Sequence, residues 1–251
     1  MITTIEYKGN QYRIDLSKPI DISIPLRNGL ENPNAYYADA PKIETIKAEE
    51  FIGSVNLGGS VNYKKISITP HGNGTHTECI GHISKEDHTI NQCFKDFFFF
   101  ADLISIQPEQ QGSDLVVTKA IVEKELQEDS TEALIIRTLP NSDEKLTKVY
   151  SGNNPPYFEV EALDMIASKN VKHLLIDLPS VDKEEDEGAV AGHKAFWNYP
   201  ESPRVDNTIT ELIYVSDEIK DGKYFLNLQI MSLESDACPS KPILFSIDSI
   251  G

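Results

Sequence analysis

Three histidines and one glutamate lie close together in a glycine-rich segment, His71-Gly-Asn-Gly-Thr-His-Thr-Glu-Cys-Ile-Gly-His82. Imidazole and carboxylate groups bind zinc, manganese and iron, and they also carry protons in catalysis. Glycines let the backbone bend, so side chains that are not spaced for a helix can still converge. The segment therefore favours a fold in which these groups meet at a metal, although a polar loop with incidental histidines would have a similar composition.

The segment has the composition of a turn-rich loop, and the spacing of its side chains shows which of them could share a face. His76 and Glu78 are two residues apart, so on a strand they point to one face. Glu78 and His82 are four residues apart, and they share a face only if the chain turns helical there. Cys79 is a further candidate ligand or reactive thiol, but we interpret it as a small buried side chain.

Composition narrows the class of protein. The chain has 251 residues, of which 39% are hydrophobic, and this is enough to bury a core without disulfides. The net charge of −17 argues against nucleic acid or an anionic membrane surface as a partner and leaves a small molecule. Residues 1–13 carry no apolar signal core, residues 97–103 are too short to span a bilayer, and three cysteines suit a reducing compartment. We expect a cytoplasmic protein.

Short apolar runs bounded by turn residues predict a mixed α/β fold, and neither a repeat nor a long linker divides residues 1–251 into several domains. Asp221-Gly222 is typical of a type I′ hairpin between two of the runs. Two helices are expected, Lys119–Leu126 and Glu159–Lys169, because each places apolar residues on one side. The predicted strands are Ile20–Leu26, Val61–Ile68, Asp102–Gln107, Ala133–Leu139, Val171–Asp177, Leu212–Ile219, Lys223–Ile230 and Lys241–Ile247.

Two long loops, residues 28–43 and 178–207, interrupt this pattern, and long loops inside a domain are commonly functional. The second loop contains His193, a candidate for a distant metal ligand that could instead pack against Trp197. Glu211 opens an apolar run, so its carboxylate is expected at the end of a strand. The acidic run Asp182–Glu187 is interpreted as a solvated turn.

The motifs resemble those of the cyclase-like metal-dependent hydrolases, the family of bacterial kynurenine formamidase and isatin hydrolase. That family has a His-x-Gly-Thr-His-x-Asp signature with a further histidine four positions beyond the aspartate, and Gly74-Thr-His-Thr-Glu78 followed by His82 is similar to it. The resemblance continues in order through Asp21–Leu26, Asp177–Asp182, His193 and Glu211, from about residue 21 to residue 247.

The chain departs from the signature at two positions. Glu78 stands where the family has aspartate, so its side chain is one methylene longer. The first family histidine aligns with Gly72, and His71 lies one residue earlier. We expect the turn Gly72-Asn73-Gly74 to absorb the extra residue, because glycine tolerates unusual backbone conformations. If it does not, one ligand is missing.

The resemblance implies a single-domain α/β/β sandwich or flattened barrel with outer helices, and a homodimer or homotetramer. It also implies one or two divalent ions, zinc or manganese, that activate water for attack on a carbonyl carbon. His71, His76 and Glu78 are assigned to a first ion, and Glu78, His193 and Glu211 to a second.

His82 is assigned to proton transfer, and Tyr36, Phe196 and Trp197 are candidate apolar walls for an aryl substrate. The expected reaction is hydrolysis of a C–N amide bond in an aryl formamide, such as N-formylkynurenine, or in a cyclic amide. The alternatives are a lactone hydrolase or lyase that uses the same ligands, and a binding protein that has kept the fold with a degenerate metal site.

Overall fold

A mixed β-sheet that closes on itself forms the body of the protein. The computed structural model describes residues 1–126 and 131–250. The strands of this sheet are β1 (Ile2–Tyr7), β2 (Asn10–Asp15), β3 (Ile20–Asp21), β8 (His76–Glu78), β9 (Phe98–Ile106), β12 (Ala133–Thr138), β14 (His173–Ile176), β15 (Thr208–Glu211), β16 (Gly222–Ile230) and β17 (Ala237–Ile250).

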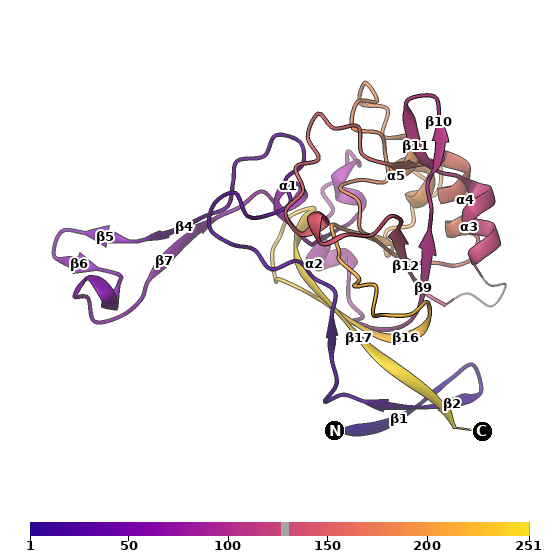
Figure 1. Ribbon diagram of the computed structural model, residues 1–251, viewed down its shortest axis with the longest axis horizontal. Helices are drawn as coiled ribbons and strands as arrows, with labels where there is room; N and C mark the ends of the chain where they lie inside the picture. Colours follow the sequence, from indigo (N-terminus) through magenta and orange to yellow (C-terminus); the bar gives the residue numbers. More distant parts are fainter. Residues whose placement is uncertain (127–130, 251) are drawn as a thin grey trace.

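The sheet runs in the order β1-β2-β17-β16-β9-β12-β14-β15-β8, and β8 pairs in addition with the first part of β17. This second pairing closes the strands from β17 round to β8 into a barrel, while the far end of β17 extends beyond it to pair with β2 (Figure 1). The predicted mixed α/β fold class is confirmed. Because β8 lies between β15 and β17, the segment that carries the histidines is part of the barrel wall.

The central strands are apolar on both faces because both faces are buried. In β12, Ala133 and Ile135 point into the barrel, whereas Leu134 and Ile136 pack against the helices outside. Those helices are α3 (Lys119–Glu125), α4 (Val160–Ser168) and α5 (Ala191–Trp197). The first two match the predicted helices, but α5 forms inside a segment predicted to be a loop. Among the described residues, no helix combines the length and the apolar character that crossing a bilayer requires.

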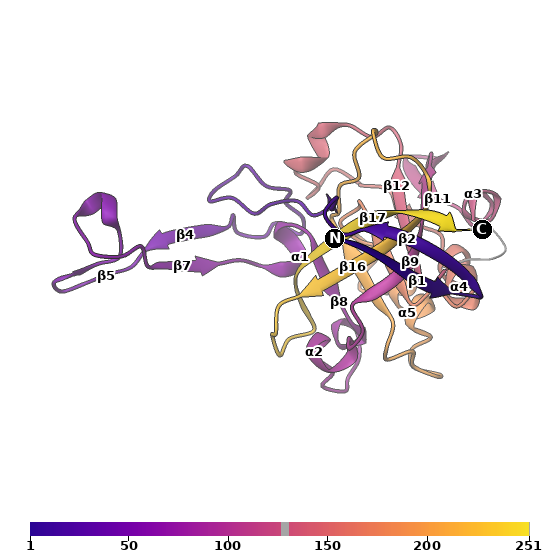
Figure 2. The same ribbon diagram turned by 90° about the horizontal axis from the view of Figure 1, so that it is seen from below.

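A long arm projects from the body and was not predicted (Figures 1 and 2). It consists of β4 (Lys42–Thr45) paired with β7 (Lys64–Ser67), and of β5 (Lys47–Ala48) paired with β6 (Phe51–Ile52), followed by the short turn η1 (Val55–Leu57). The strand predicted over Val61–Ile68 is therefore shorter and lies on the arm. At its base the arm leads into α1 (Pro70–Asn73), which carries His71.

The remaining elements are short and lie outside the main sheet: β10 (Glu109–Gln111), β11 (Asp114–Val117), β13 (Tyr157–Phe158), α2 (Ile90–Cys93), and the 3₁₀ turns η2 (Ile80–His82) and η3 (Asp143–Leu146).

The predicted strand Leu212–Ile219 and the Asp221-Gly222 hairpin are wrong. Strand β15 ends at Glu211, before the predicted strand would begin. Strand β16 pairs with β9 and β17 instead of with residues 212–219. Arg137 explains the difference, because its guanidinium donates to the carbonyl oxygens of Ser216 and Ile219, both at 2.8 Å. The Asp221 carboxylate accepts from the same guanidinium and from Ser105, so a buried cation fixes this segment as a loop.

Candidate metal centre

Strand β8 places two side chains of the cluster in the barrel wall. His76 and Glu78 point to the same face and are fully buried. The chain then turns through η2, which returns His82 towards the strand, so that its Nε2 lies 4.0 Å from Glu78 Oε2. The conditions under which these side chains could share a face, a strand over His76 and Glu78 and a helical turn before His82, are both met.

His71 reaches the cluster although it lies one residue early. Pro70 occupies the first position of α1, where its fixed φ angle suits a helix start, and His71 Nδ1 lies 3.1 Å from Glu78 Oε2. A side chain at Gly72 has no room, because a Cβ atom there would clash with Ala38 and lie 2.8 Å from the carbonyl oxygen of Ala35. The packing of residues 35–38 on Gly72 therefore excludes a histidine at position 72 and leaves His71 to face Glu78.

His193 and Glu211 come from distant elements and complete the cluster. His193, on α5, places Nε2 3.0 Å from Glu78 Oε1. Glu211 is the last residue of β15, directly opposite His76 in the strand pairing, and its Oε2 lies 3.3 Å from His76 Nε2. Its Oε1 lies 4.0 Å from His193 Nε2. Glu78 thus contacts histidines on two sides, one through each carboxylate oxygen.

The imidazole rings of His71, His76 and His193 each have an oxygen acceptor next to the nitrogen that points away from the cluster. His76 Nδ1 donates to the carbonyl oxygen of Gly74 at 2.9 Å, and His193 Nδ1 contacts Asp182 Oδ2 at 2.5 Å. His71 Nε2 contacts Asp236 Oδ2 at 2.9 Å. Such outer hydrogen bonds fix the tautomer of metal-binding histidines, so the opposite nitrogen of each ring is free to bind a cation in the cluster.

Several inward-facing atoms lack a hydrogen-bond partner: His76 Nε2, Glu78 Oε2 and Glu211 Oε1 are buried and unsatisfied. Leaving such atoms without a partner is unfavourable, and a cation bound in the cluster would satisfy them. Ligands of a tetrahedral zinc ion, each about 2.0–2.1 Å from it, lie roughly 3.3 Å from one another. The contact of 3.1 Å from Glu78 to His71 and that of 3.3 Å from Glu211 to His76 are close to this spacing, so the donor set fits a divalent ion.

The charges of the cluster also favour a cation. Burial by itself lowers the pKa of His71, but the neighbouring carboxylates of Asp236 and Glu78 raise it to about 10. Burial opposes the charged form of His193 as well, and the carboxylates of Glu78 and Asp182 raise its pKa. Burial and the neighbouring charge of Glu78 raise the pKa of Glu211. The carboxylates thus attract positive charge, which protons or a metal ion can supply.

A pocket of about 270 Å³ opens onto the cluster, and His71, His82, His193 and Glu211 form part of its wall. Tyr36, a candidate wall residue, lines the same pocket, and burial followed by the charge of Glu211 raises the pKa of its hydroxyl. Tyr36 has a left-handed backbone with φ of 54°, which is uncommon for a bulky residue.

Phe196 and Trp197 do not line this pocket, and the structure corrects the expectation that they form its walls. Both side chains have 0% exposure and belong to the core between the helices and the sheet. The indole nitrogen of Trp197 donates to the carbonyl oxygen of Asn207 at 2.9 Å, and its ring lies 5.5 Å from that of His193. Trp197 therefore packs beneath the metal-facing histidine as part of the core.

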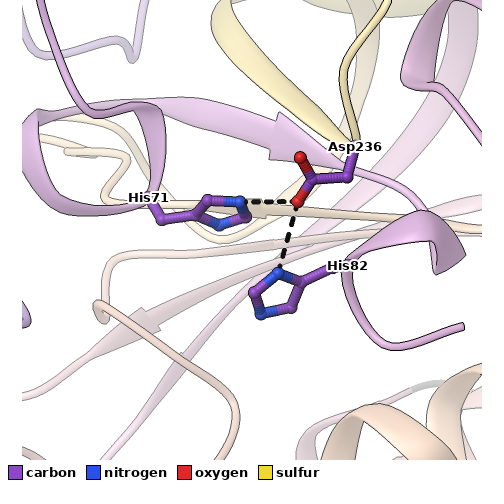
Figure 3. Close-up of side chains that lie close together, drawn as sticks. All are labelled: His71, His82 and Asp236. Carbon is purple, nitrogen blue, oxygen red and sulfur yellow. Dashed lines mark hydrogen bonds and ion pairs between the residues drawn. The ribbon is translucent and has the colours of Figure 1, made fainter.

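Two residues of the site were missed from the sequence. Asp182 was interpreted as part of a solvated turn, but its carboxylate binds His193 and the backbone amide of Gly192. Asp236 precedes β17 and contacts both His71 and His82 (Figure 3). The pairing of β17 with β8 brings Asp236 to the cluster, so nothing near it in the sequence indicates this position.

A barrel whose wall carries converging histidines and carboxylates defines a class of metal-binding α/β proteins. A sequence profile of the family described as "Putative cyclase" matches residues 14–183, more than half of the chain. The protein belongs to this family.

Relatives match over nearly the full length of the chain. Kynurenine formamidase from Bacillus cytotoxicus is 26% identical over 234 residues, which cover 91% of this chain and 97% of that protein. A solved structure of a potential metal-dependent hydrolase with cyclase activity has a TM-score of 0.66 at 18% identity, with 91% of this chain and 97% of that chain covered. Isatin hydrolase A from Labrenzia aggregata has a TM-score of 0.65 at 14% identity, with coverage of 91% and 93%.

Proposed function

We propose that this protein is a metal-dependent hydrolase that cleaves a C–N amide bond, either in an aryl formamide or in a cyclic amide. The observation that carries the proposal is that five potential ligands converge next to a pocket: His71, His76, Glu78, His193 and Glu211. Three of their nitrogen and oxygen atoms are buried without a hydrogen-bond partner. The similarity to kynurenine formamidases over nearly the whole chain supports the choice of an amide as substrate.

His71, His76 and Glu78 would hold a first divalent ion, and Glu78, His193 and Glu211 a second. The mixture of imidazole and carboxylate ligands suits zinc, and manganese is the alternative. An ion bound here supplies Lewis-acid activation of the substrate carbonyl and of solvent.

His82 is the residue that we assign to proton transfer. Its side chain is 32% exposed at the pocket, whereas Glu78 is fully buried, so His82 lies between the cluster and solvent. Imidazole is the commonest general acid–base group in enzymes. The amine of a cleaved amide leaves poorly as an anion. His82 Nε2 faces the cluster, where it can take a proton from the attacking solvent and pass it to the departing amine. Tyr36 lines the pocket and would offer its ring and its hydroxyl to an aryl substrate.

The test combines elemental analysis of the purified protein with turnover of aryl formamides, cyclic amides and lactones, each with and without a chelator. Activity that survives complete removal of metal would refute the proposal. His82→Ala is expected to retain bound metal and lose turnover. His88→Ala, which changes a histidine outside the cluster, serves as the matched control and is expected to retain both.

Product identification separates the alternatives. A lactone hydrolase or lyase would turn over its own substrate class with the same ion, whereas a binding protein with a degenerate site would bind the ligand and convert none. Full metal occupancy together with hydrolysis of an amide supports the proposed function over both.

A homodimer or homotetramer is proposed as well, and the arm of residues 42–67 supports it. The arm exposes apolar side chains, among them Val55 (52%), Tyr63 (57%) and Ile66 (63%), and two-stranded structures are marginally stable alone. Light scattering coupled to size exclusion tests the assembly, and a monomer at micromolar concentration would contradict it. The free cysteines support a cytoplasmic location, which fractionation of cells producing the protein tests.

A further inference from the structure

One carboxylate oxygen faces two histidines of the site. Asp236 Oδ2 lies 2.9 Å from His71 Nε2 and 3.4 Å from His82 Nδ1 (Figure 3). The two imidazole rings stack with their centroids 4.3 Å apart, so they approach the carboxylate side by side. Because a carboxylate only accepts hydrogen bonds, His71 Nε2 must carry a proton to bond to it, and the same oxygen attracts a proton on His82 Nδ1.

The nitrogen on the opposite side of each ring points towards Glu78. His71 Nδ1 lies 3.1 Å from Glu78 Oε2, and His82 Nε2 lies 4.0 Å from the same oxygen. With the outer nitrogens protonated, the lone pair of a neutral ring faces the cluster in both residues. The acceptor on the outer nitrogen therefore decides which nitrogen of each histidine is available for chemistry.

The position of Asp236 is fixed by the same pair of strands that carries Glu78. Its carbonyl oxygen accepts from the backbone amide of Cys79 at 3.0 Å, and Ala237 is paired with Glu78. The hydroxyl of Ser235 donates to Asp236 Oδ1 at 3.0 Å, which leaves Oδ2 to the two histidines. The carboxylate is thus held at a fixed distance from the cluster rather than on a free loop.

We propose that Asp236 is a positioning residue that sets the tautomers of His71 and His82 together, so that His71 offers Nδ1 to the metal and His82 offers Nε2 to the reacting groups. The part that concerns His82 in catalysis rests on the proposed function. The part that concerns the tautomers and metal binding does not, and it can be measured without a substrate.

The decisive experiment records the imidazole nitrogen–proton correlations of the ¹⁵N-labelled, Zn²⁺-loaded protein by NMR, with His71→Ala and His82→Ala spectra for assignment. We expect His71 protonated on Nε2 and His82 protonated on Nδ1. A wild-type spectrum with the proton of His82 on Nε2 would overturn the proposal. This measurement needs no Asp236 variant, so it remains decisive if such a variant does not fold.

The variant Asp236→Asn then tests whether Asp236 is the cause of these tautomers. The carboxamide offers one acceptor and one donor in place of two equivalent oxygens, so it cannot hold both rings in the same way. We expect Zn²⁺ affinity to fall by about 10- to 100-fold, as is typical when a ligand loses its outer partner, and at least one tautomer to change. Asp236→Glu, which keeps the charge, is expected to recover part of the affinity. Unchanged affinity and unchanged tautomers in Asp236→Asn would overturn the proposal.

Asp164→Asn is the matched control, because it makes the same chemical change on the exposed side of α4 and is expected to alter neither readout. Kinetics separate this proposal from the proposed function. If amide turnover exists, Asp236→Asn should lower kcat more than it changes KM at saturating Zn²⁺. If the wild type hydrolyses no amide while the tautomers and the affinity behave as expected, the proposed function fails and the positioning role of Asp236 stands.

Discussion

His173 offers a quantitative test of how the protein treats a buried histidine away from the carboxylates. It begins β14, is 4% exposed, and packs its ring 4.1 Å from Phe99 and 5.3 Å from Phe94. Its Nδ1 contacts the hydroxyl of Thr208 at 2.9 Å. Burial, with a smaller contribution from the charge of Lys172, lowers its pKa to about 3. This direction is opposite to that of His71, because aromatic rings surround His173 where carboxylates surround His71.

The lowered pKa makes stability depend on pH. In the unfolded chain a histidine titrates near pH 6.5, so between pH 6.5 and 3 the unfolded state binds a proton that the folded state does not. The contribution is fully present above pH 6.5 and is lost as pH falls towards 3. Between pH 7 and pH 5 the free energy of unfolding should therefore decrease by about 2 kcal/mol from His173 alone, at about 1.4 kcal/mol per pKa unit.

The assay is urea unfolding of wild type and His173→Asn at pH 7 and pH 5, with a chelator present in every sample. The asparagine variant keeps a polar group near Thr208 but has no group that titrates in this range. Its overall stability is expected to be lower, but the comparison uses only the change with pH, in which contributions from all other groups cancel. We expect the wild type to lose about 2 kcal/mol more than the variant. Equal losses in the two proteins would refute the reasoning.

Three further perturbations test the site and its support. Glu78→Gln removes the charge that faces His71, His82 and His193. Zn²⁺ affinity measured by calorimetry should therefore fall by more than about 100-fold, beyond the usual effect of losing an outer partner, and a value near wild type would contradict this. Gly72→Ala forces a Cβ against Ala38 and should reduce the free energy of unfolding by about 1–3 kcal/mol, with partial recovery when Ala38→Gly is added; a neutral effect would show that residues 35–38 move easily. The ammonium of Lys145 lies 2.7 Å from the buried carboxylate of Asp177, and Lys145→Met removes this cation. The free energy of unfolding, measured by denaturant titration, should fall by about 3–5 kcal/mol, and adding Asp177→Asn should reduce that loss.

Strands that are buried on both faces were predictable from the sequence, since a continuous apolar run is what such a position requires. The runs at Ala133–Leu139 and Lys223–Ile230 correspond to β12 and β16 within a residue or so at each end. The apolar run at Leu212–Ile219 forms no strand, because Arg137, which lies far away in the sequence, binds its carbonyl oxygens. A local sequence pattern cannot show that a side chain as distant as Arg137 will bind these carbonyl oxygens.

The arm of residues 42–67 escaped prediction for a related reason. Its strands are short and mostly exposed, and residues along β4 alternate only between exposed and partly buried. The sequence therefore shows little of the apolar–polar alternation that marks a strand with one buried face. The same segment carries several exposed apolar side chains, which the composition alone does not distinguish from core residues. Only the positions of the elements show that these side chains lie away from the body.

Within the candidate site, the sequence was informative where ligands are neighbours and uninformative where tertiary pairing supplies them. His71, His76, Glu78 and His82 were found from their spacing, because β8 and η2 are local structures. The prediction that His193 and Glu211 are metal ligands was weak from the residues alone, and the family resemblance strengthened it. Asp236 lies 165 residues from His71 and is brought to it by the pairing of β17 with β8, so no local pattern reveals it.

The two departures from the family signature meet at one contact, and the structure relates them physically. His71 lies one residue early, next to a Gly72 at which residues 35–38 leave no room for a side chain, and Glu78 carries one methylene more than the aspartate of the signature. The longer side chain places Oε2 3.1 Å from His71 Nδ1 while Oε1 remains 3.0 Å from His193 Nε2. A shorter carboxylate on the same buried strand would draw back from both histidines at once. The longer acid therefore compensates for the displaced histidine, and the pair of changes preserves a carboxylate that faces both halves of the cluster, which is the arrangement that a bridging metal ligand requires.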